Sequence, residues 1–271
     1  MKTVIKGLAT FLSLSLMLLI HEFGHFTAMR SLGVPVEAFS IGIPVPYMTA
    51  KTQLRLYPGT TFQISPLILG GAVSPAKEAR RILKAMPISD VTHVYARGAE
   101  FGLYVGSAIL LLLNVRKWSE RSRTRKLVVL IPTGLSVCTI VMPFATEFFL
   151  FPLIGIAQII YVVISRGQGI TGPIEVGKMF MKNAFQGCRI YLEYFAIIIL
   201  AITAINTLPI EPFDSAKPIS ALIARHSERA ADIYFRGSLI LLLLVVCVIV
   251  LAPMVRRLIQ LNAELRHPPT E

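Results

Sequence analysis

Charged residues are scarce in this chain of 271 residues, where Asp, Glu, Lys and Arg together make up 15% of the sequence. A soluble globular domain carries about a quarter of such residues. Hydrophobic residues reach 54%, and the mean hydropathy is +0.67. These values exclude an ordinary soluble domain and predict an integral membrane protein.

Cysteine is also scarce, and Cys138, Cys188 and Cys247 lie far apart in the sequence. An odd number of widely spaced cysteines indicates neither a disulfide framework nor a thiolate metal site. Two of them fall inside apolar runs, where a free cysteine packs as a small hydrophobic residue. Any metal or catalytic site must therefore use other side chains.

Acidic residues are outnumbered by basic ones, 15 to 27, which leaves a formal net charge of +12. Such an excess can indicate nucleic-acid binding, but no recognised binding motif accompanies it. Most Lys and Arg residues lie between apolar runs, which is typical of charge that flanks membrane spans. The predicted partner is therefore the lipid bilayer and not a nucleic acid.

Six apolar stretches are each able to cross a bilayer core of about 30 Å as a helix. We predict an all-α polytopic membrane protein of about six transmembrane helices, forming one membrane-embedded domain over residues 1–271. The first run is interpreted as a span and not as a cleaved signal peptide, because no small-x-small cleavage site follows Ile20. The core spans are expected at about 7–29, 98–114, 194–210 and 237–255, with an inserted apolar hairpin at about 127–164.

A small β-structure is predicted between the first two core spans, at about residues 52–73. The stretch "LRLYPGTTFQIS" is typical of two short strands around a Pro58–Gly59 turn. The "PLILGGAV" that follows is apolar but too short to span. A β-hairpin or small sheet at membrane depth is tolerated where surrounding protein shields it.

Membrane orientation stays open on charge alone. Placing the His21 end of the first span in the cytosol puts twelve basic residues there and fifteen on the other side. The positive-inside rule therefore favours neither arrangement.

Three ionisable residues interrupt the first apolar run, in the stretch "LLIHEFGHF". His21 and His25 are four residues apart and share one face of a helix, where two imidazoles can bind one Zn²⁺. Glu22 beside them can act as general base on a metal-bound water. The alternative is two packed histidines and a buried glutamate, but ionisable groups within a span are costly and mark functional sites.

A catalytic zinc site needs a third protein ligand and an open position. Asp214 stands out because Pro209 and Pro212 break the helix just before it, and broken helices at membrane depth line cavities. From the residues alone, Asp214 could be a ligand or a loop carboxylate outside the membrane. The other aspartates and histidines are Asp90, Asp232, His93, His226 and His267.

These stretches resemble the site-2 proteases, a family of intramembrane zinc metalloproteases, with the bacterial regulator-of-sigma-E protease branch as the most similar. "LLIHEFGHF" is similar to the first family motif, and "NTLPIEPFD" to the second, Asn-x-x-Pro-x-x-Pro-x-Asp. The stretches "PLILGGAV", "ITGPIEVGKMF" and "SERAADIYFRGSLILLLL" resemble further family elements in the family's order.

The resemblance implies that His21, His25 and Asp214 bind Zn²⁺, that Glu22 is the catalytic general base, and that Asn206 contacts the substrate backbone. It implies a zinc metalloendopeptidase that cleaves within or near transmembrane segments, as in regulated intramembrane proteolysis. The expected substrates are single-span membrane proteins or signal-peptide-like segments. The expected location is the bacterial inner membrane, as a multi-pass protein.

The strand pair at Leu54–Ser65 has two interpretations in such a protease. An extended substrate could add to its edge by β-augmentation, or the sheet could simply cover the active site. The apolar insert at 127–164 likewise could gate lateral substrate entry or serve only in packing. It stands where the similar branch carries PDZ domains.

Two departures from the family pattern leave an alternative function open. Ser215 follows the motif aspartate where the family commonly has glycine, and Ala99 and Gly102 stand where the second core helix usually has proline and asparagine. The alternative is a catalytically impaired zinc-binding protein that binds transmembrane helices. Proteases that trim prenylated proteins also carry His-Glu-x-x-His, but they lack the "NTLPIEPFD" pattern.

Overall fold

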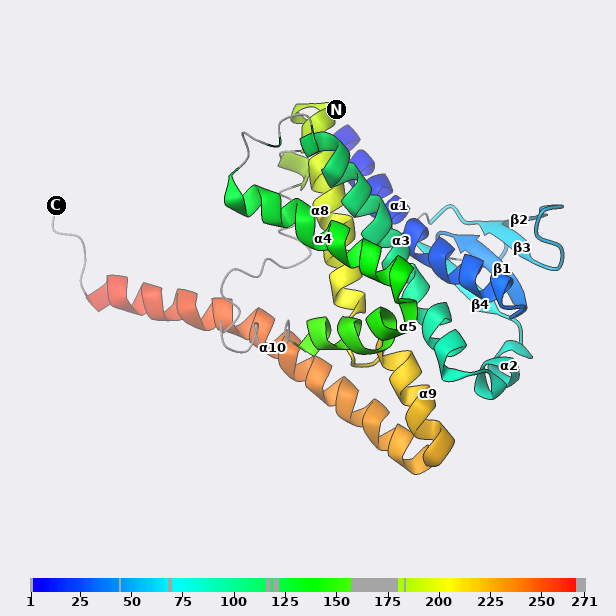
Figure 1. The fold of residues 1–271 in the computed structure, drawn as a ribbon. Helices are drawn as coiled ribbons and strands as arrows, with labels where there is room; N and C mark the ends of the chain where they lie inside the picture. Colours follow the sequence, from blue (N-terminus) through cyan, green and yellow to red (C-terminus); the bar gives the residue numbers. More distant parts are fainter. Residues whose placement is uncertain are drawn as a thin grey trace.

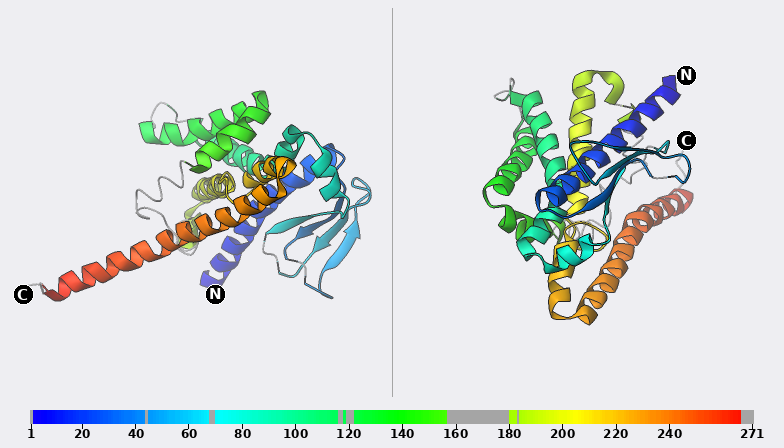
Figure 2. Two further views of the ribbon diagram at one scale, coloured as in Figure 1. Left: turned by 90° about the horizontal axis from the view of Figure 1, so that it is seen from below. Right: turned by 90° about the vertical axis from the view of Figure 1, so that its right-hand side faces the viewer.

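A bundle of long helices with a small sheet at its side makes up the protein (Figure 1). Helices α1 (Lys2–Ser31), α3 (Ile88–Asn114) and α8 (Cys188–Asn206) pack against one another. Helix α10 (Glu228–Arg266) runs from α9 (Ala216–His226) away from the bundle, which both views of Figure 2 show. The computed structural model describes residues 2–43, 45–67, 70–115, 118, 122–156, 180–182 and 184–266.

Four helices of the described residues are long and apolar enough to cross a membrane, and they lie within α1, α3, α8 and α10. The predicted helical membrane fold with a small sheet is thereby confirmed. The two further spans expected in 127–164 are not. Helix α4 (Arg123–Val141) has Pro132 inside it and is not among the four candidates, and residues 157–164 lie outside the described part of the chain.

The ends of α3 and α8 show why helix bounds differ from the apolar runs in the sequence. Helix α3 begins at Ile88, well before the expected start at Gly98. Its first turns carry polar side chains that find partners inside the protein, such as Thr92, whose hydroxyl donates to the Ile88 carbonyl at 2.8 Å. Helix α8 ends at Asn206 and not at Ile210, because Pro209 and Pro212 cannot continue it.

The sheet has four strands in the order β2-β3-β1-β4, with β1 parallel to β3 and antiparallel to β4. Of the strand pair predicted in Leu54–Ser65, only the second strand is present, as β3. Its antiparallel partner is β2, which ends at Gln53, before the predicted first strand begins. The connection between β2 and β3 consists of turns. The backbone N–H of Tyr57 donates to the Leu54 carbonyl, and the N–H of Thr60 donates to the Tyr57 carbonyl. The strands are β1 (Val36–Ile41), β2 (Ala50–Gln53), β3 (Thr61–Ile64) and β4 (Gly71–Pro75).

An aromatic cluster holds the sheet against the last turns of α1. The Phe26 ring, which is fully buried, lies 5.2 Å from Phe39, 5.0 Å from Tyr57 and 5.8 Å from Phe62 between centroids. Aromatic pairs at such separations stabilise by about 0.5–1.5 kcal/mol each beyond the burial of their area. Because Phe26 follows His25 directly, this cluster places the sheet beside the HEFGH segment.

Small residues let α3 and α8 approach closely. Gly102 and Gly106 lie on one face of α3, and an added Cβ would come within 2.3 Å of Thr203 Oγ1 and 2.6 Å of Leu200 Cγ, respectively. The Thr203 hydroxyl also donates to the Ala99 carbonyl at 3.3 Å. Close backbone contact of this kind is typical of helix packing in membranes.

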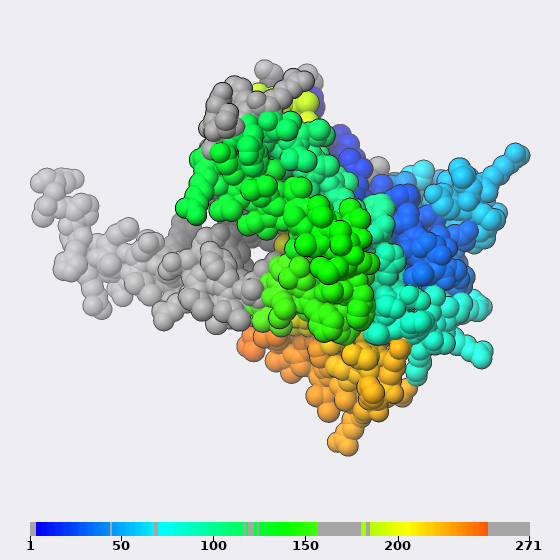
Figure 3. Space-filling view, viewed as in Figure 1, coloured from blue at the N-terminus to red at the C-terminus, as the bar shows by residue number. Residues whose placement is uncertain are grey.

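The segment inserted between α3 and α8 packs on α3 through polar contacts. The Tyr104 hydroxyl lies 2.9 Å from Thr139 Oγ1, and the Ser136 hydroxyl donates to Ser107 Oγ at 3.1 Å. Helix α5 (Pro143–Ala145) and the π-helical turn Thr146–Leu150 follow α4, and Figure 3 shows this segment in green over much of one face. These contacts attach the insert to α3, while its expected role as a gate stays a prediction.

Candidate metal centre and active site

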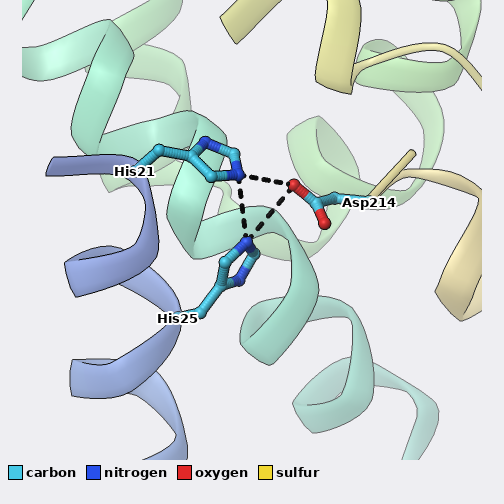
Figure 4. Close-up of side chains that lie close together, drawn as sticks. All are labelled: His21, His25 and Asp214. Carbon is cyan, nitrogen blue, oxygen red and sulfur yellow. Dashed lines mark hydrogen bonds and ion pairs between the residues drawn. The ribbon is translucent and has the colours of Figure 1, made fainter. Parts of the chain in front are cut away.

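Three side chains converge from two distant parts of the chain (Figure 4). His21 Nε2 lies 2.8 Å from Asp214 Oδ2, His25 Nε2 lies 3.2 Å from the same oxygen, and the two Nε2 atoms lie 3.2 Å apart. Their side chains are nearly buried, with exposed fractions of 7% and 9% for the histidines and 17% for the aspartate. The structure therefore brings together the two helix residues and the loop carboxylate that the sequence indicated.

The three facing atoms fit a bound cation. His25 Nδ1 lies 2.9 Å from the carbonyl oxygen of Val94, so this nitrogen carries a proton and donates it. In neutral His25, Nε2 then directs a lone pair toward the Asp214 carboxylate, which is an acceptor as well. Ligand atoms around a tetrahedral Zn²⁺, with bonds of about 2.0–2.1 Å, lie about 3.3 Å apart. The observed separations are close to that value.

Two glycines let the histidines sit against α3. An added Cβ at Gly98 would lie 2.3 Å from His25 Nε2 and 2.8 Å from His21 Cε1. An added Cβ at Gly24 would lie 2.3 Å from the backbone oxygen of Arg97. The close approach of both imidazoles to α3 therefore requires a glycine at position 98. Helix α3 continues through Ala99 without interruption.

Glu22 lies between the histidines and the sheet. Its Oε2 accepts a hydrogen bond of 3.3 Å from the backbone N–H of Val73 in β4. Strand β4 is one edge of the sheet, whereas β3 lies between β2 and β1. Strand β2 is the other edge of the sheet, so the interpretation of the hairpin as a substrate edge stays a prediction, whereas the edge beside Glu22 is β4.

The loop that carries Asp214 is held at both ends. The backbone N–H of Ser215 donates to the Asn206 carbonyl at 3.2 Å, which closes the loop on the end of α8. The Tyr234 hydroxyl of α10 donates to the Pro209 carbonyl at 2.6 Å. An ion pair between Lys217 and the buried Glu211 adds a third contact, and the Glu211–Pro212 peptide bond is cis.

Ser215 needs no glycine-like freedom. Its φ of −66° and ψ of −15° lie in the right-handed helical region, which any L-residue adopts. The residue is buried at the N-cap position of α9, where its side chain makes no capping hydrogen bond. Replacement of the family's glycine therefore leaves the Asp214 loop unstrained.

The loop position of Asp214 also keeps its carboxylate ionised. Burial by itself raises the pKa of Asp214, but when His25 is protonated its charge and the hydrogen bonds from His21 and His25 outweigh burial and hold the pKa below the usual range. The ionised form is the one that binds a metal cation.

Asn206 lies at the last turn of α8, half-buried. Its Nδ2 donates to the Ile202 carbonyl at 3.1 Å, within the same helix. Its backbone carbonyl is the acceptor that closes the Asp214 loop. The expected contact between Asn206 and the substrate backbone stays a prediction.

A second cluster of ionisable side chains occupies another face of α3. His93 Nδ1 lies 3.2 Å from Glu147 Oε1, and Arg97 donates to Glu100 Oε2 at 2.6 Å. Potential ligand atoms of His93, Glu100 and Glu147 lie within 4.8 Å of one another. Because the Arg97 guanidinium already offsets one buried carboxylate, we interpret the group as an ion-pair network that joins α3 to the insert. The sequence did not indicate it, since Glu147 merely separates two apolar runs.

The remaining candidate ligands lie elsewhere. Asp232 pairs with Arg236 at 2.9 Å on the exposed side of α10, and Asp90 accepts from Ser89 at 3.4 Å. His226 is exposed at the end of α9, and His267 lies outside the described residues.

Comparison with known proteins agrees with this geometry. A protein of Campylobacter jejuni, named "Putative zinc metalloprotease Cj1068", is 47% identical over 70 residues, which cover 26% of this chain. The matched part is 17% of the length of that protein. The family model described as "Peptidase family M50" matches residues 9–245. With nearly all of the chain inside that match, the protein belongs to peptidase family M50, the site-2 protease family of zinc metalloproteases.

Proposed function

We propose that this protein is an intramembrane zinc metalloprotease that hydrolyses peptide bonds within or near transmembrane segments of membrane proteins. The observation that carries the proposal is the convergence of His21, His25 and the loop residue Asp214 next to Glu22, with the histidines and Glu22 on a helix that is apolar enough to span a membrane. Family membership supports the same chemistry.

The ligand set and the base have separate tasks. His21 Nε2, His25 Nε2 and Asp214 Oδ2 would hold the metal, and the Val94 carbonyl fixes the tautomer of His25. A zinc ion held by these residues would act as a Lewis acid, which makes a carbonyl more electrophilic and water more acidic. Glu22 takes a proton from the attacking water on its carboxylate and delivers it to the leaving amide nitrogen.

The substrate binds in an extended conformation. Peptide bonds inside a helix are shielded by its own hydrogen bonds, so the substrate must unwind before water reaches a carbonyl. Strand β4 offers a free edge at which an extended segment can be added. A substrate carbonyl at the Val73 N–H replaces Glu22 there, and this exchange frees the glutamate for proton transfer.

Substrate class and location extend the proposal. We place single-span membrane proteins or signal-peptide-like segments among the substrates, in regulated intramembrane proteolysis, with the enzyme a multi-pass protein of the bacterial inner membrane. The alternative of an impaired zinc-binding protein rested on Ser215 and on the start of the second core helix. Neither feature supports that alternative, because the backbone at Ser215 is unstrained and α3 is continuous.

The test compares the wild-type protein with Glu22→Gln in membranes. The variant should keep its zinc, measured by elemental mass spectrometry, and lose cleavage by about 10²–10⁴-fold, the usual contribution of a general base. Mass spectrometry of membrane peptides then identifies fragments that only the active protein produces. Normal turnover by Glu22→Gln would contradict the assignment of the base.

A further inference from the structure

A basic cavity of about 790 Å³ opens between α2 (Ala79–Ala85), α9 and the first turns of α3. Four cationic residues line it, namely Lys77, Arg80, Lys84 and Arg225, and none of its lining residues is acidic. Figure 1 shows α2 and α9 at the same end of the bundle. The cavity is separate from the metal centre and takes no part in the proposed proton transfers.

Two of the cations have no ionic partner. Lys84 pairs with Glu228 at 3.0 Å, and Arg225 donates to the Met86 carbonyl. Lys77 and Arg80 are in no ion pair within the part of the chain that the structure describes. A concave surface with uncompensated positive charge concentrates anions.

The position of the cavity indicates which anion. Two candidate spans begin beside it, α3 at Ile88 and α10 at Glu228, while α2 and α9 are not among the candidate spans. The cavity therefore lies where spanning helices meet the polar boundary of the membrane, at the depth of phospholipid headgroups. Basic pockets between helices at this level are suited to anionic lipid headgroups.

The lining has an apolar side as well. Leu83, Tyr95 and Ala221 face the cavity together with the cations. A free phosphate would leave this apolar surface unused, whereas a phospholipid places its phosphate against the cations and its glycerol and upper acyl chain against the apolar side. We propose that the cavity is a binding site for the phosphodiester headgroup of one anionic phospholipid.

Such a lipid would contact two functional segments at once. The cavity includes Pro75, the last residue of β4, and Ala221 of α9, the helix that follows Asp214. The proposal goes beyond proteolysis and needs only that the protein is embedded in a membrane.

The test is native mass spectrometry of the full chain with phosphatidylglycerol or the zwitterionic phosphatidylcholine of the same acyl chains. The wild type should retain one phosphatidylglycerol in preference to phosphatidylcholine. The double variant Lys77→Gln/Arg80→Gln should bind phosphatidylglycerol about 10- to 30-fold more weakly, from roughly 1 kcal/mol for each cation. Unchanged zinc content and melting temperature show that the variant is folded.

A matched control removes the same charge outside the cavity. Arg81 of α2 and Arg229 of α10 are exposed and do not line it. Arg81→Gln/Arg229→Gln should retain phosphatidylglycerol as the wild type does.

Four outcomes overturn the proposal. If both double variants lose the same affinity for phosphatidylglycerol, lipid binding is due to general surface charge. If the wild type retains phosphatidylglycerol and phosphatidylcholine equally, there is no site specific for an anionic lipid. If inorganic phosphate displaces the bound phosphatidylglycerol as effectively as short-chain phosphatidylglycerol does, the cavity is a site for a free anion. If Lys77→Gln/Arg80→Gln retains the lipid but no longer cleaves substrates that carry acidic residues, the cavity binds the substrate peptide.

Discussion

Replacement of Gly98 by alanine should remove zinc from the protein while leaving most of the fold in place. The new Cβ would lie 2.3 Å from His25 Nε2 and 2.8 Å from His21 Cε1, where ordinary contacts begin at 3.4 Å. The imidazole of His25 must therefore move by roughly 1 Å, and a displacement of this size in an active site costs about 10²-fold in rate. Because His25 Nε2 is a proposed metal ligand, the same movement weakens zinc binding.

The chain offers a control of the same severity. Gly102 lies one turn further along α3, and its added Cβ would also come within 2.3 Å of an atom, Thr203 Oγ1, at the contact with α8. Gly102→Ala should lower the melting temperature to a similar extent but keep its zinc. Gly134 of α4 has no atom within 4 Å of an added Cβ, so Gly134→Ala should affect neither property adversely.

The assay is competition with a zinc-binding dye on purified protein, together with elemental analysis and thermal unfolding. Gly98→Ala should lose zinc to the dye at concentrations that leave Gly102→Ala loaded. Unaltered zinc affinity in Gly98→Ala would refute the reasoning, because the side chain at the closest approach would then not be a ligand.

Three further predictions concern contacts around the site. Val73→Pro removes the N–H that donates to Glu22 and would donate to the substrate. Because proline is tolerated on an edge strand, zinc content should stay constant while substrate cleavage falls sharply. Normal cleavage would exclude β4 as the substrate edge. Tyr234→Phe removes the hydrogen bond to the Pro209 carbonyl and should lower the free energy of unfolding by about 1 kcal/mol, measured by denaturant titration, whereas no change would show that this contact does not hold the loop. Arg97→Gln leaves the fully buried Glu100 carboxylate without its cation and should cost about 3–5 kcal/mol of stability, and adding Glu100→Gln should restore most of it; a double variant no more stable than Arg97→Gln would argue against a charge network.

The part of the site that lies on one helix could be predicted from the sequence because it depends only on helical periodicity. His21 and His25, four residues apart, must share a face, and Glu22 must project to one side of them. Of the predicted strand pair, only the second strand was located correctly, since turn residues indicate a hairpin better than they indicate the ends of its strands. Strands β1 and β4 were missed because their partners lie far away in the sequence.

The contacts between helices could not be predicted in this way. The pairing of His93 with Glu147 depends on the insert folding back on α3, and a single sequence carries no local signal for that. Helix α3 begins well before the apolar run at Gly98 for a related reason. Its polar first turns look unsuited to a membrane until their partners inside the protein are known.

Composition and local spacing alone determined that this is a helical membrane protein with a histidine pair suited to zinc. Both follow from interactions within one segment, namely transfer of apolar helices into a bilayer and the repeat of an α-helix. The tertiary structure decided that Asp214 meets those histidines, that Gly98 makes room for them, and that Glu22 contacts the edge strand β4. These arrangements depend on long-range packing, which brings residues almost two hundred positions apart into contact.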